Sequence, residues 1–333
     1  MKMSRKRGPV SIVTIAEELG ISVASVSRVV NNRTGVSEPL RRRILEKLRE
    51  YDFKTNYPAQ RRPRIAIVSF SPSLSSYHTM LMNGIFACLL EHDVMPCTLF
   101  YKSGGRESLL ELLRDQQCSG VILIVPSHFS AELPELADSG LPVMLLDEPA
   151  DIPGIGYIDN DSYAGSLKAA QLLLSLGHRR IAYILSGYRT INHQQRFKAY
   201  RDAVSEAGCG ITVMTEPQQD ISRFLKDHPE ITAVMTTNDD IAIRVLRAAY
   251  GLHIRVPDDL SVIGFDDYPV SSELCPPLTT IRRPLAEAGR MAAESILNFL
   301  ESNGKGLLPR RILPTELVIR DTTSPCKNKK SGS

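Results

Sequence analysis

Three polar residues of this 333-residue chain stand where a parallel sheet would bind a small ligand. Asp147, Asn238 and Asp266 each follow a short apolar run that is typical of a buried strand. In open parallel sheets, ligands bind beyond the carboxyl ends of the strands. Together with Arg196, these residues suit a polyhydroxylated ligand, because a carboxylate accepts hydrogen bonds from two hydroxyls and a guanidinium donates a fork of them. Asp266 or Asn238 alone could instead be a helix or turn cap.

The motifs do not indicate covalent chemistry. The sequence holds no Gly-x-Ser-x-Gly and no His-Glu-x-x-His, and Gly304-Lys305 is followed by Gly306 rather than by the Ser or Thr of a Walker A motif. The six cysteines are scattered, with neither a Cys-x-x-Cys pair nor a His at zinc spacing. We therefore predict no enzymatic activity, no catalytic residue, no metal site, no cofactor and no disulfide framework.

Charge is divided unevenly along the chain. Residues 1–64 hold 15 Lys and Arg against 6 Asp and Glu, whereas the other 269 residues hold 25 against 31. A basic segment on an acidic body predicts an anionic partner for that segment. Because the sequence shows no apolar signal-peptide region and no apolar run near the ~18 residues of a membrane span, we expect a cytoplasmic protein with no membrane partner.

Apolar spacing in the basic segment predicts three short helices. The first lies between an N-cap at Ser11 and a C-terminal Gly20, and the second begins after an N-cap at Ser22 and ends at Asn31. The third runs from residue 38 to about residue 51. The tight turn between the first two predicts a helix-turn-helix. We expect the third helix to keep its basic side chains solvated, namely Arg41, Arg42, Arg43, Lys47 and Arg49.

The second predicted helix carries a recognisable pattern. Residues 14–31 read Thr-Ile-Ala-Glu-Glu-Leu-Gly-Ile-Ser-Val-Ala-Ser-Val-Ser-Arg-Val-Val-Asn. This stretch resembles the DNA-binding headpiece of the LacI/GalR family of transcription regulators, whose pattern is Ala-x-x-x-Gly-[Val/Ile]-Ser-x-x-[Thr/Ser]-Val-Ser-Arg-Val-[Ile/Val]-Asn. The resemblance implies that the helix starting at residue 23 is the recognition helix and lies in the major groove of double-stranded DNA.

The resemblance also assigns roles in this headpiece. Val23 and Ala24 occupy the two main specificity positions, as in galactose-type repressors, and would read thymine methyls and groove shape. Arg28 matches the arginine that reaches a base edge, in the manner of a guanine contact. The remaining polar residues would mostly hold phosphates: Ser11, Ser22, Ser25, Ser27 and Asn31.

The linker, residues 56–63, departs from the family pattern. The family has Asn-x-x-Ala-x-x-Leu, in which the Leu wedges into the minor groove; here Asn56 and Ala59 match, but Arg62 replaces the Leu. Pro63 prevents a helix at that point, so a hinge helix longer than about two turns is not expected. Two alternatives remain: the arginines Arg61, Arg62 and Arg64 enter the minor groove as cations, or they form a solvated basic linker.

From residue 64 onward, apolar runs alternate with helical segments. Strands are predicted at residues 65–70, 94–100, 121–125, 143–146, 181–185, 233–236 and 260–264, and residues 157–161 are a plausible crossing between two sheets. The phrases at residues 176–182, 196–200, 237–240, 256–267 and 276–281 resemble those of the two-lobed, periplasmic-binding-protein-like core of the same family. The acidic pairs at 239–240, 258–259 and 266–267 lie in strand–helix junctions of that family, where capping is the commoner role.

This resemblance implies an α/β protein with an N-terminal all-α helix-turn-helix headpiece and a two-lobed core of parallel sheets. We predict a headpiece at 1–55, the linker at 56–63, a core at 64–323 and a disordered tail at 324–333. Within the core, one lobe would comprise about 64–160 and 284–311, and the other about 161–283 and 312–323. By resemblance, the effector pocket takes Arg196, Asn238 and Asp266, together with Asp147 and Tyr77.

The predicted function is a sequence-specific transcriptional repressor under allosteric control. A homodimer would bind a pseudo-palindromic operator, and a small molecule, a sugar or sugar derivative, would bind between the lobes. The chain has no Trp, so Tyr77, Phe70 or Tyr268 would have to stack on a sugar ring. An apolar helix around Met80–Phe86 motivates the dimer, with a half-buried core helix as the alternative. A sugar-binding receptor without a DNA role and a sugar-modifying enzyme are the rival functions.

Overall fold

The computed structural model describes residues 11–31, 33–51, 53, 62–70, 75–187 and 190–327. The chain divides into two compact units, Met1–Arg62 and Pro63–Ser333, which are treated separately below. In the described part, no helix is long and apolar enough to cross a membrane.

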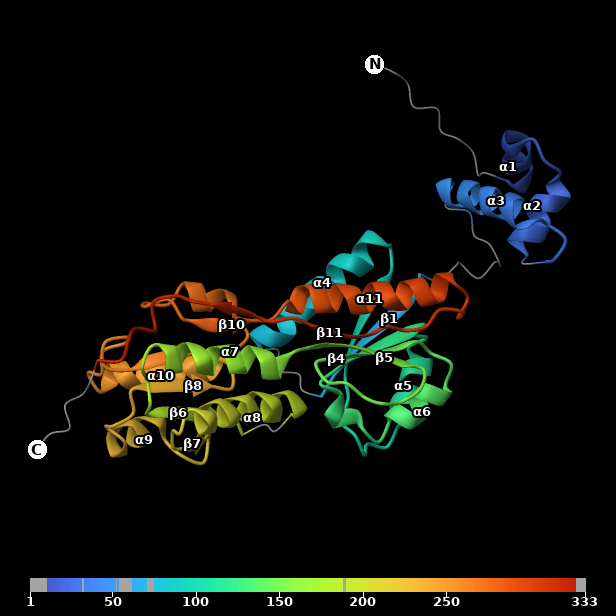
Figure 1. The fold of residues 1–333 in the computed structure, drawn as a ribbon. Helices are drawn as coiled ribbons and strands as arrows, with labels where there is room; N and C mark the ends of the chain where they lie inside the picture. The colour runs from blue at the N-terminus through green and yellow to red at the C-terminus, as the bar shows by residue number, and fades with distance from the viewer. Residues whose placement is uncertain are drawn as a thin grey trace, which may run out of the picture. The chain divides into compact units, whose positions relative to one another are not determined.

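The first unit is a three-helix headpiece built on the predicted caps (Figure 1). It contains α1 (Ile12–Leu19), α2 (Val23–Val30) and α3 (Glu38–Glu50). Ser11 Oγ accepts a hydrogen bond from Thr14 N, and Ser22 Oγ accepts one from Ser25 N. Gly20 ends α1 with a φ of 65°, a left-handed conformation that glycine adopts at no steric cost. The buried core of this unit consists of Ile15, Ala16, Val26, Val29, Ile44 and Leu48.

The expectation that the basic side chains of α3 stay solvated is wrong for Arg41. This residue is buried, and its guanidinium donates to the Arg33 carbonyl at 2.6 Å. Lys47 is half-buried and pairs with Glu18 at 3.1 Å, which ties α3 to α1. Arg42 and Arg43 are exposed, whereas the side chain of Arg49 is outside the described part. Two of the basic groups therefore stabilise the headpiece itself.

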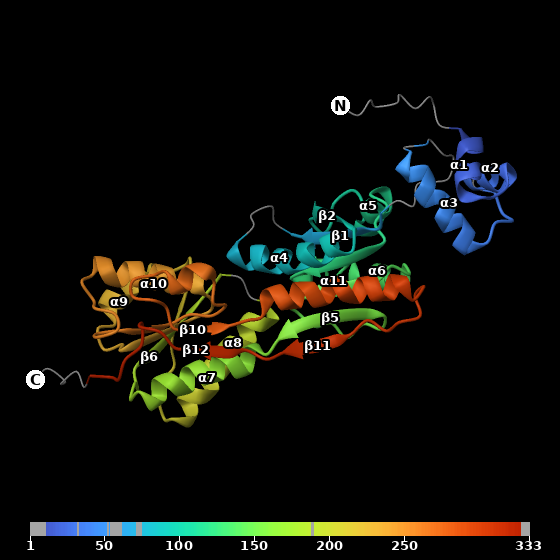
Figure 2. The same cartoon turned by 90° about the horizontal axis from the view of Figure 1, so that it is seen from above.

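The second unit contains two parallel sheets, one in each lobe (Figures 1 and 2). The first-lobe sheet has the order β11-β5-β4-β3-β1-β2, with β1 (Arg64–Ser69), β2 (Met95–Phe100), β3 (Gly120–Ile124), β4 (Val143–Leu146), β5 (Ile155–Asn160) and β11 (Arg310–Leu313). The second-lobe sheet has the order β7-β6-β8-β9, with β6 (Ile181–Leu185), β7 (Thr212–Thr215), β8 (Ala233–Thr236) and β9 (Ser261–Ile263). An antiparallel pair joins β10 (Thr280–Arg282) to β12 (Glu316–Val318).

Helices cover both faces of each sheet, as parallel strands require. In the first lobe these are α4 (Ser76–Glu91) and α11 (Leu285–Glu301) on one face, with α5 (Leu109–Asp115) and α6 (Leu133–Asp138) on the other. In the second lobe, α7 (Ser162–Ser175) and α8 (Ile191–Glu206) pack opposite α9 (Ile221–Asp227) and α10 (Asp239–Gly251). Two 3-10 turns, Pro126–Phe129 and Pro269–Ser272, follow strand ends.

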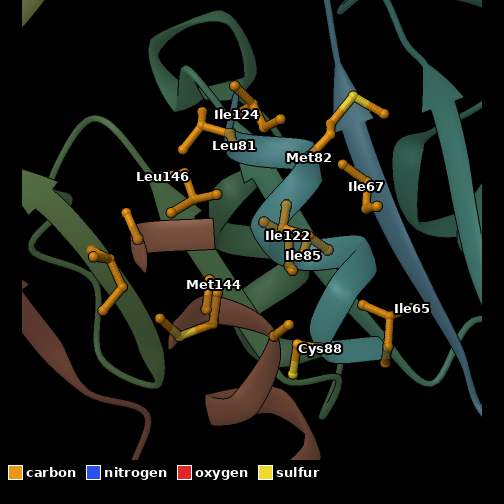
Figure 3. Packing of buried hydrophobic residues seen from close by; sticks show 14 of the residues in the cluster. Ile65, Ile67, Leu81, Met82, Ile85, Cys88, Ile122, Ile124, Met144 and Leu146 are labelled. Carbon is orange, nitrogen blue, oxygen red and sulfur yellow. The ribbon is translucent and has the colours of Figure 1, made fainter. Parts of the chain in front are cut away.

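The helix that motivates the dimer contributes one of its faces to the core of the first lobe. On α4, Leu81, Met82 and Ile85 are buried in the cluster shown in Figure 3. This helix lies beside α11, and Gly84 allows the approach because a Cβ there would come within 1.8 Å of the Ala286 carbonyl oxygen. Packing within one chain therefore buries Leu81, Met82 and Ile85, while Met80 and Phe86 stay half-buried.

The chain crosses between the lobes after β5, after β10 and between β11 and β12. The predicted crossing at residues 157–161 is in fact mostly strand β5, and the passage begins at Asp161, which caps α7. The predicted lobe boundary at 311–312 is also displaced, because Leu313 still pairs with Asn160 in β11.

The predicted disordered tail is wrong for residues 324–327. Ser324 Oγ donates to the Pro257 carbonyl at 3.1 Å, and Cys326 N donates to the Leu176 carbonyl at 2.8 Å. These bonds hold the segment against the second lobe. Residues 328–333 lie outside the described residues.

Candidate nucleic-acid interface and interlobe cavity

Helix α2 separates a buried face from an exposed one. Val26 and Val29 are fully buried, whereas Val23 retains 39% of its surface and Ala24 and Arg28 are also exposed. The three residues predicted to read bases therefore share the solvent side of α2.

The predicted phosphate-binding residues surround the ends of the helices. Ser11, Ser22 and Asn31 are exposed, and Ser25 and Ser27 are half-buried. The first two hydroxyls cap their helices, while Asn31 Nδ2 donates to the Ser27 carbonyl at 3.0 Å. The positive end of the α2 dipole adds to the attraction of an anion at this surface.

The structure describes only part of the predicted linker. Asn56 and Arg61 lie outside the described residues, and Arg62 is exposed. Arg64 does not belong to the linker: it opens β1, is half-buried, and donates from Nη1 to the Gln116 carbonyl at 3.1 Å. The alternative that placed Arg64 in a DNA groove is therefore wrong.

A cavity of about 300 Å³ lies between the two lobes. Its walls come from the ends of β1, β3 and β4 and the start of α4 in the first lobe, and from α8 and the ends of β8 and β9 in the second. Its lining residues are Phe70, Ser75, Tyr77, His78, Val125, His128, Asp147, Thr190, His193, Arg196, Asn238, Asp240, Asp266, Tyr268 and Arg283. The structure thus brings together all five residues that were predicted for the effector pocket.

Three of the lining residues adopt left-handed backbone conformations. Val125, Asp147 and Asp266 have φ values of 57°, 80° and 116°. Such conformations cost a non-glycine residue on the order of 1–3 kcal/mol each and cluster at ligand sites. Their position directly after strands aims the two carboxylates toward the cavity.

Two buried arginines organise these carboxylates. Arg283, in the passage between β10 and α11, forms ion pairs with Asp147 of the first lobe and with Asp266 of the second, where Nη1 lies 3.1 Å from Oδ1. Arg196 donates to the Thr237 carbonyl at 2.6 Å and lies 3.5 Å from Asp266 Oδ1. Arg283 thus links the two lobes by charge.

Burial shifts the ionisation of this centre. Loss of hydration raises the pKa of Asp266 to about 7, although the nearby Arg196 opposes the shift. The same loss of hydration lowers the pKa of Arg283 to about 10, so this guanidinium stays protonated at neutral pH. Tyr268 donates its hydroxyl to Asp266 Oδ2 at 2.7 Å. These groups form one connected polar network with almost no access to water.

A second polar contact joins the lobes behind the cavity. Glu148 accepts hydrogen bonds from Ser127 N at 2.8 Å in the first lobe and from Ile191 N at 3.0 Å at the start of α8. The Asn192 amide donates to the Asp147 carbonyl and, at 2.8 Å, to Asp159 Oδ1. Burial raises the pKa of Asp159 to about 6. The start of α8 is therefore fixed to the first lobe.

Sequence reasoning missed several cavity residues. Arg283 carries no local motif, and His78, His128 and His193 stand at no recognisable spacing. Asn238 is both a cap and a lining residue, since its Oδ1 accepts from Ile241 N at 3.0 Å. The three candidate stacking residues, Tyr77, Phe70 and Tyr268, all line the cavity.

All residues of the three acidic pairs except Asp240 have protein contacts within the described part of the chain. Asp239 is buried and accepts hydrogen bonds from Ser271 Oγ and Thr280 Oγ1, both at 2.6 Å. Asp259 pairs with Arg255, and Asp267 pairs with Arg282. No group of three His, Cys, Asp or Glu that could hold a metal ion occurs among the described residues.

Comparison with known proteins agrees with both parts of the chain. Residues 11–56 match the family model described as bacterial regulatory proteins, lacI family, and residues 170–323 match a periplasmic binding protein-like domain. The HTH-type transcriptional regulator DegA of Bacillus subtilis is 31% identical over 95% of this chain and 98% of its own. The ribose operon repressor of Halalkalibacterium halodurans is 25% identical over 97% and 99%.

Solved structures give the same result. The lac repressor dimer bound to operator and an anti-inducer is 25% identical, covers 95% of this chain and all of its own, and superposes with a TM-score of 0.74. A relative above 30% identity over nearly the full length of both chains, together with the match to the headpiece model, settles the family. The chain therefore belongs to the LacI family of DNA-binding transcriptional regulators.

Proposed function

We propose that this regulator is a homodimeric repressor whose α2 reads a pseudo-palindromic operator and whose interlobe cavity binds a carbohydrate effector. The observation that carries the proposal is the cavity itself, where carboxylates, guanidiniums and an amide converge from both lobes. A ligand held by both lobes has different contacts when the lobes move apart, so it has unequal affinity for the two arrangements. That inequality is what allows an effector to change the operator affinity.

The assignment of DNA contacts rests on exposure and on the relatives. Val23, Ala24 and Arg28 share one solvent face of α2, and the related lac repressor dimer was solved on its operator. The homodimer is proposed from that relative. The name of the related ribose operon repressor supports a sugar as the effector class. We propose no enzymatic activity.

The DNA-binding assignment is tested with an operator selected from a random DNA pool by the full-length protein. Arg28→Ala should lower the affinity for that operator roughly tenfold to a hundredfold, since a bidentate base contact contributes about 1–3 kcal/mol. Arg201→Ala is the matched control, because this arginine is half-exposed on α8 and removes the same charge far along the chain. Equal affinities of the two variants would contradict the role of Arg28.

A further inference from the structure

The interlobe cavity has more negative than positive groups around it. Six carboxylates line it or lie directly behind its lining residues: Asp147, Glu148, Asp159, Asp239, Asp240 and Asp266. In the described part of the chain, only two guanidiniums, Arg196 and Arg283, lie among them. Three histidines also line the cavity, and burial lowers the pKa of His78, which keeps it neutral. Carboxyl groups therefore outnumber guanidinium groups around the cavity.

The carboxylates differ in how they are satisfied. Asp266 is bonded through both oxygens, to Arg283 and to Tyr268, and Asp147 pairs with Arg283. Both guanidiniums pair with carboxylates, but Arg283 Nε has no hydrogen-bond partner among the described residues. An anionic ligand such as a sugar phosphate would have to approach these carboxylates as well as the two guanidiniums.

Asp240 is the carboxylate that remains available. It lines the cavity at the start of α10 and, in the described part of the chain, has no hydrogen bond or ion pair with another residue. The positive charge of Arg244 acts on this carboxylate, but Arg244 is held by Glu216, with Nε 2.9 Å from Oε2. Burial raises the pKa of Asp240, as expected for a carboxylate that lacks a counter-charge.

The first lobe supplies neutral hydrogen-bonding groups to the same cavity. Tyr77 and His78 are 9% and 7% exposed, and neither the Tyr77 hydroxyl nor His78 Nε2 has a hydrogen-bond partner in the structure. Phe70 stacks on His128 with ring centroids 3.8 Å apart. Aromatic faces attract ammonium groups, and buried unpaired polar atoms are costly unless a ligand satisfies them. A volume of about 300 Å³ is at the low end for ligand pockets, which suits a single sugar ring.

We propose that the effector is an amino sugar whose ammonium group pairs with Asp240, while its hydroxyls bond to the remaining polar groups of both lobes. This inference rests on the proposed function, in which the cavity binds a carbohydrate. The inference goes beyond that function by specifying the charge of the ligand. The ammonium group supplies the counter-charge that Asp240 lacks.

The test compares matched ligands on the full-length wild-type protein by titration calorimetry. The probes are D-glucose and D-galactose, their 2-amino derivatives, their 6-phosphates and the corresponding uronic acids. An amino sugar should bind at least tenfold more tightly than its parent, and the phosphate and the acid should bind most weakly. Asp240→Asn should remove most of that preference, measured as the ratio of amino-sugar to parent-sugar affinity within the same variant. Asp115→Asn, which replaces an exposed carboxylate at the end of α5, should leave this ratio unchanged.

Each result decides between the two proposals. A neutral or anionic probe that binds most tightly and changes operator affinity would overturn the ammonium assignment and leave the proposed function standing. An Asp240→Asn protein with wild-type melting temperature and an unchanged preference would also overturn it. Failure of every probe to bind would contradict the carbohydrate effector and, with it, this inference. The wild-type series gives its answer even if the variant does not fold.

Discussion

Replacing Arg283 by Met should destabilise the core strongly. The side chain of Arg283 is only 2% exposed and neutralises two carboxylates, Asp147 at 9% and Asp266 at 4%. Removal of one partner of a buried ion pair leaves an uncompensated charge and costs about 3–5 kcal/mol of unfolding free energy. In a unit of this size, that loss corresponds to a fall in melting temperature on the order of 10 °C.

The neighbouring residue provides the matched control. Arg282 pairs with Asp267 and with Glu316, but its side chain is 48% exposed. Exposed pairs contribute about 0–1 kcal/mol, so Arg282→Met should cost less than about 1 kcal/mol. Urea unfolding followed by circular dichroism measures both variants against the wild type at pH 7.5.

The pH dependence gives a second, independent readout. Asp266 has a folded-state pKa that is raised to about 7, so its proton stabilises the folded form at low pH and that contribution is lost as pH rises toward 7. Loss of the cation 3.1 Å away should raise this pKa further. The deficit of Arg283→Met should therefore be smallest near pH 5 and largest near pH 8. A deficit no larger than that of Arg282→Met, or one that does not vary with pH, would refute the buried ionic link between the lobes.

Three further outcomes are expected. Gly84→Ala should lower the free energy of unfolding in urea by about 1–3 kcal/mol or more, because the added Cβ would collide with the Ala286 backbone. Gly210 has open space around it, so Gly210→Ala should change that free energy by no more than about 0.5 kcal/mol. Equal effects of the two variants would contradict the α4–α11 contact. The unfolding free energy of the wild type should fall from pH 5 to pH 7, and Asp266 should contribute at most ~1.4 kcal/mol per pH unit to that fall. Asp266→Asn should make this pH dependence shallower. An unchanged pH dependence in the variant would count against the raised pKa of Asp266. Asn192→Ala should cost about 1–3 kcal/mol, because the buried Asp159 carboxylate loses its side-chain amide donor and keeps only the backbone amide of Asn160. Hydrogen exchange at the start of α8 should rise, and unaltered exchange would argue against this contact.

The sequence predicts best those features that depend on nearby residues. The headpiece helices have their caps and apolar faces within one or two turns, so Ser11, Ser22 and Gly20 mark their ends correctly. Strand ends in the core are likewise local, and parallel sheets place their carboxyl ends at one edge. For this reason Asp147, Asn238 and Asp266 were predicted to share a site, and they do line one cavity.

Contacts that are distant in sequence could not be predicted in this way. Arg283 lies where the chain crosses between the lobes, and its partner Asp147 lies more than a hundred residues earlier, in the first lobe. The apolar pattern of α4 suits a dimer surface and a core helix equally well, and the sequence does not show that α11 packs against Gly84. The same limit applies to Cys326, whose backbone contact with Leu176 orders a segment that composition alone suggests is disordered.

The central claim is that an effector in the interlobe cavity changes the operator affinity of the headpiece. The most direct measurement is a reciprocal titration: operator affinity by fluorescence anisotropy with and without the tightest-binding sugar probe, and sugar affinity by calorimetry with and without operator. Linkage requires both affinities to change by the same factor, which we expect to be roughly 5- to 150-fold. A sugar that binds in the cavity while both factors remain at one would contradict the account.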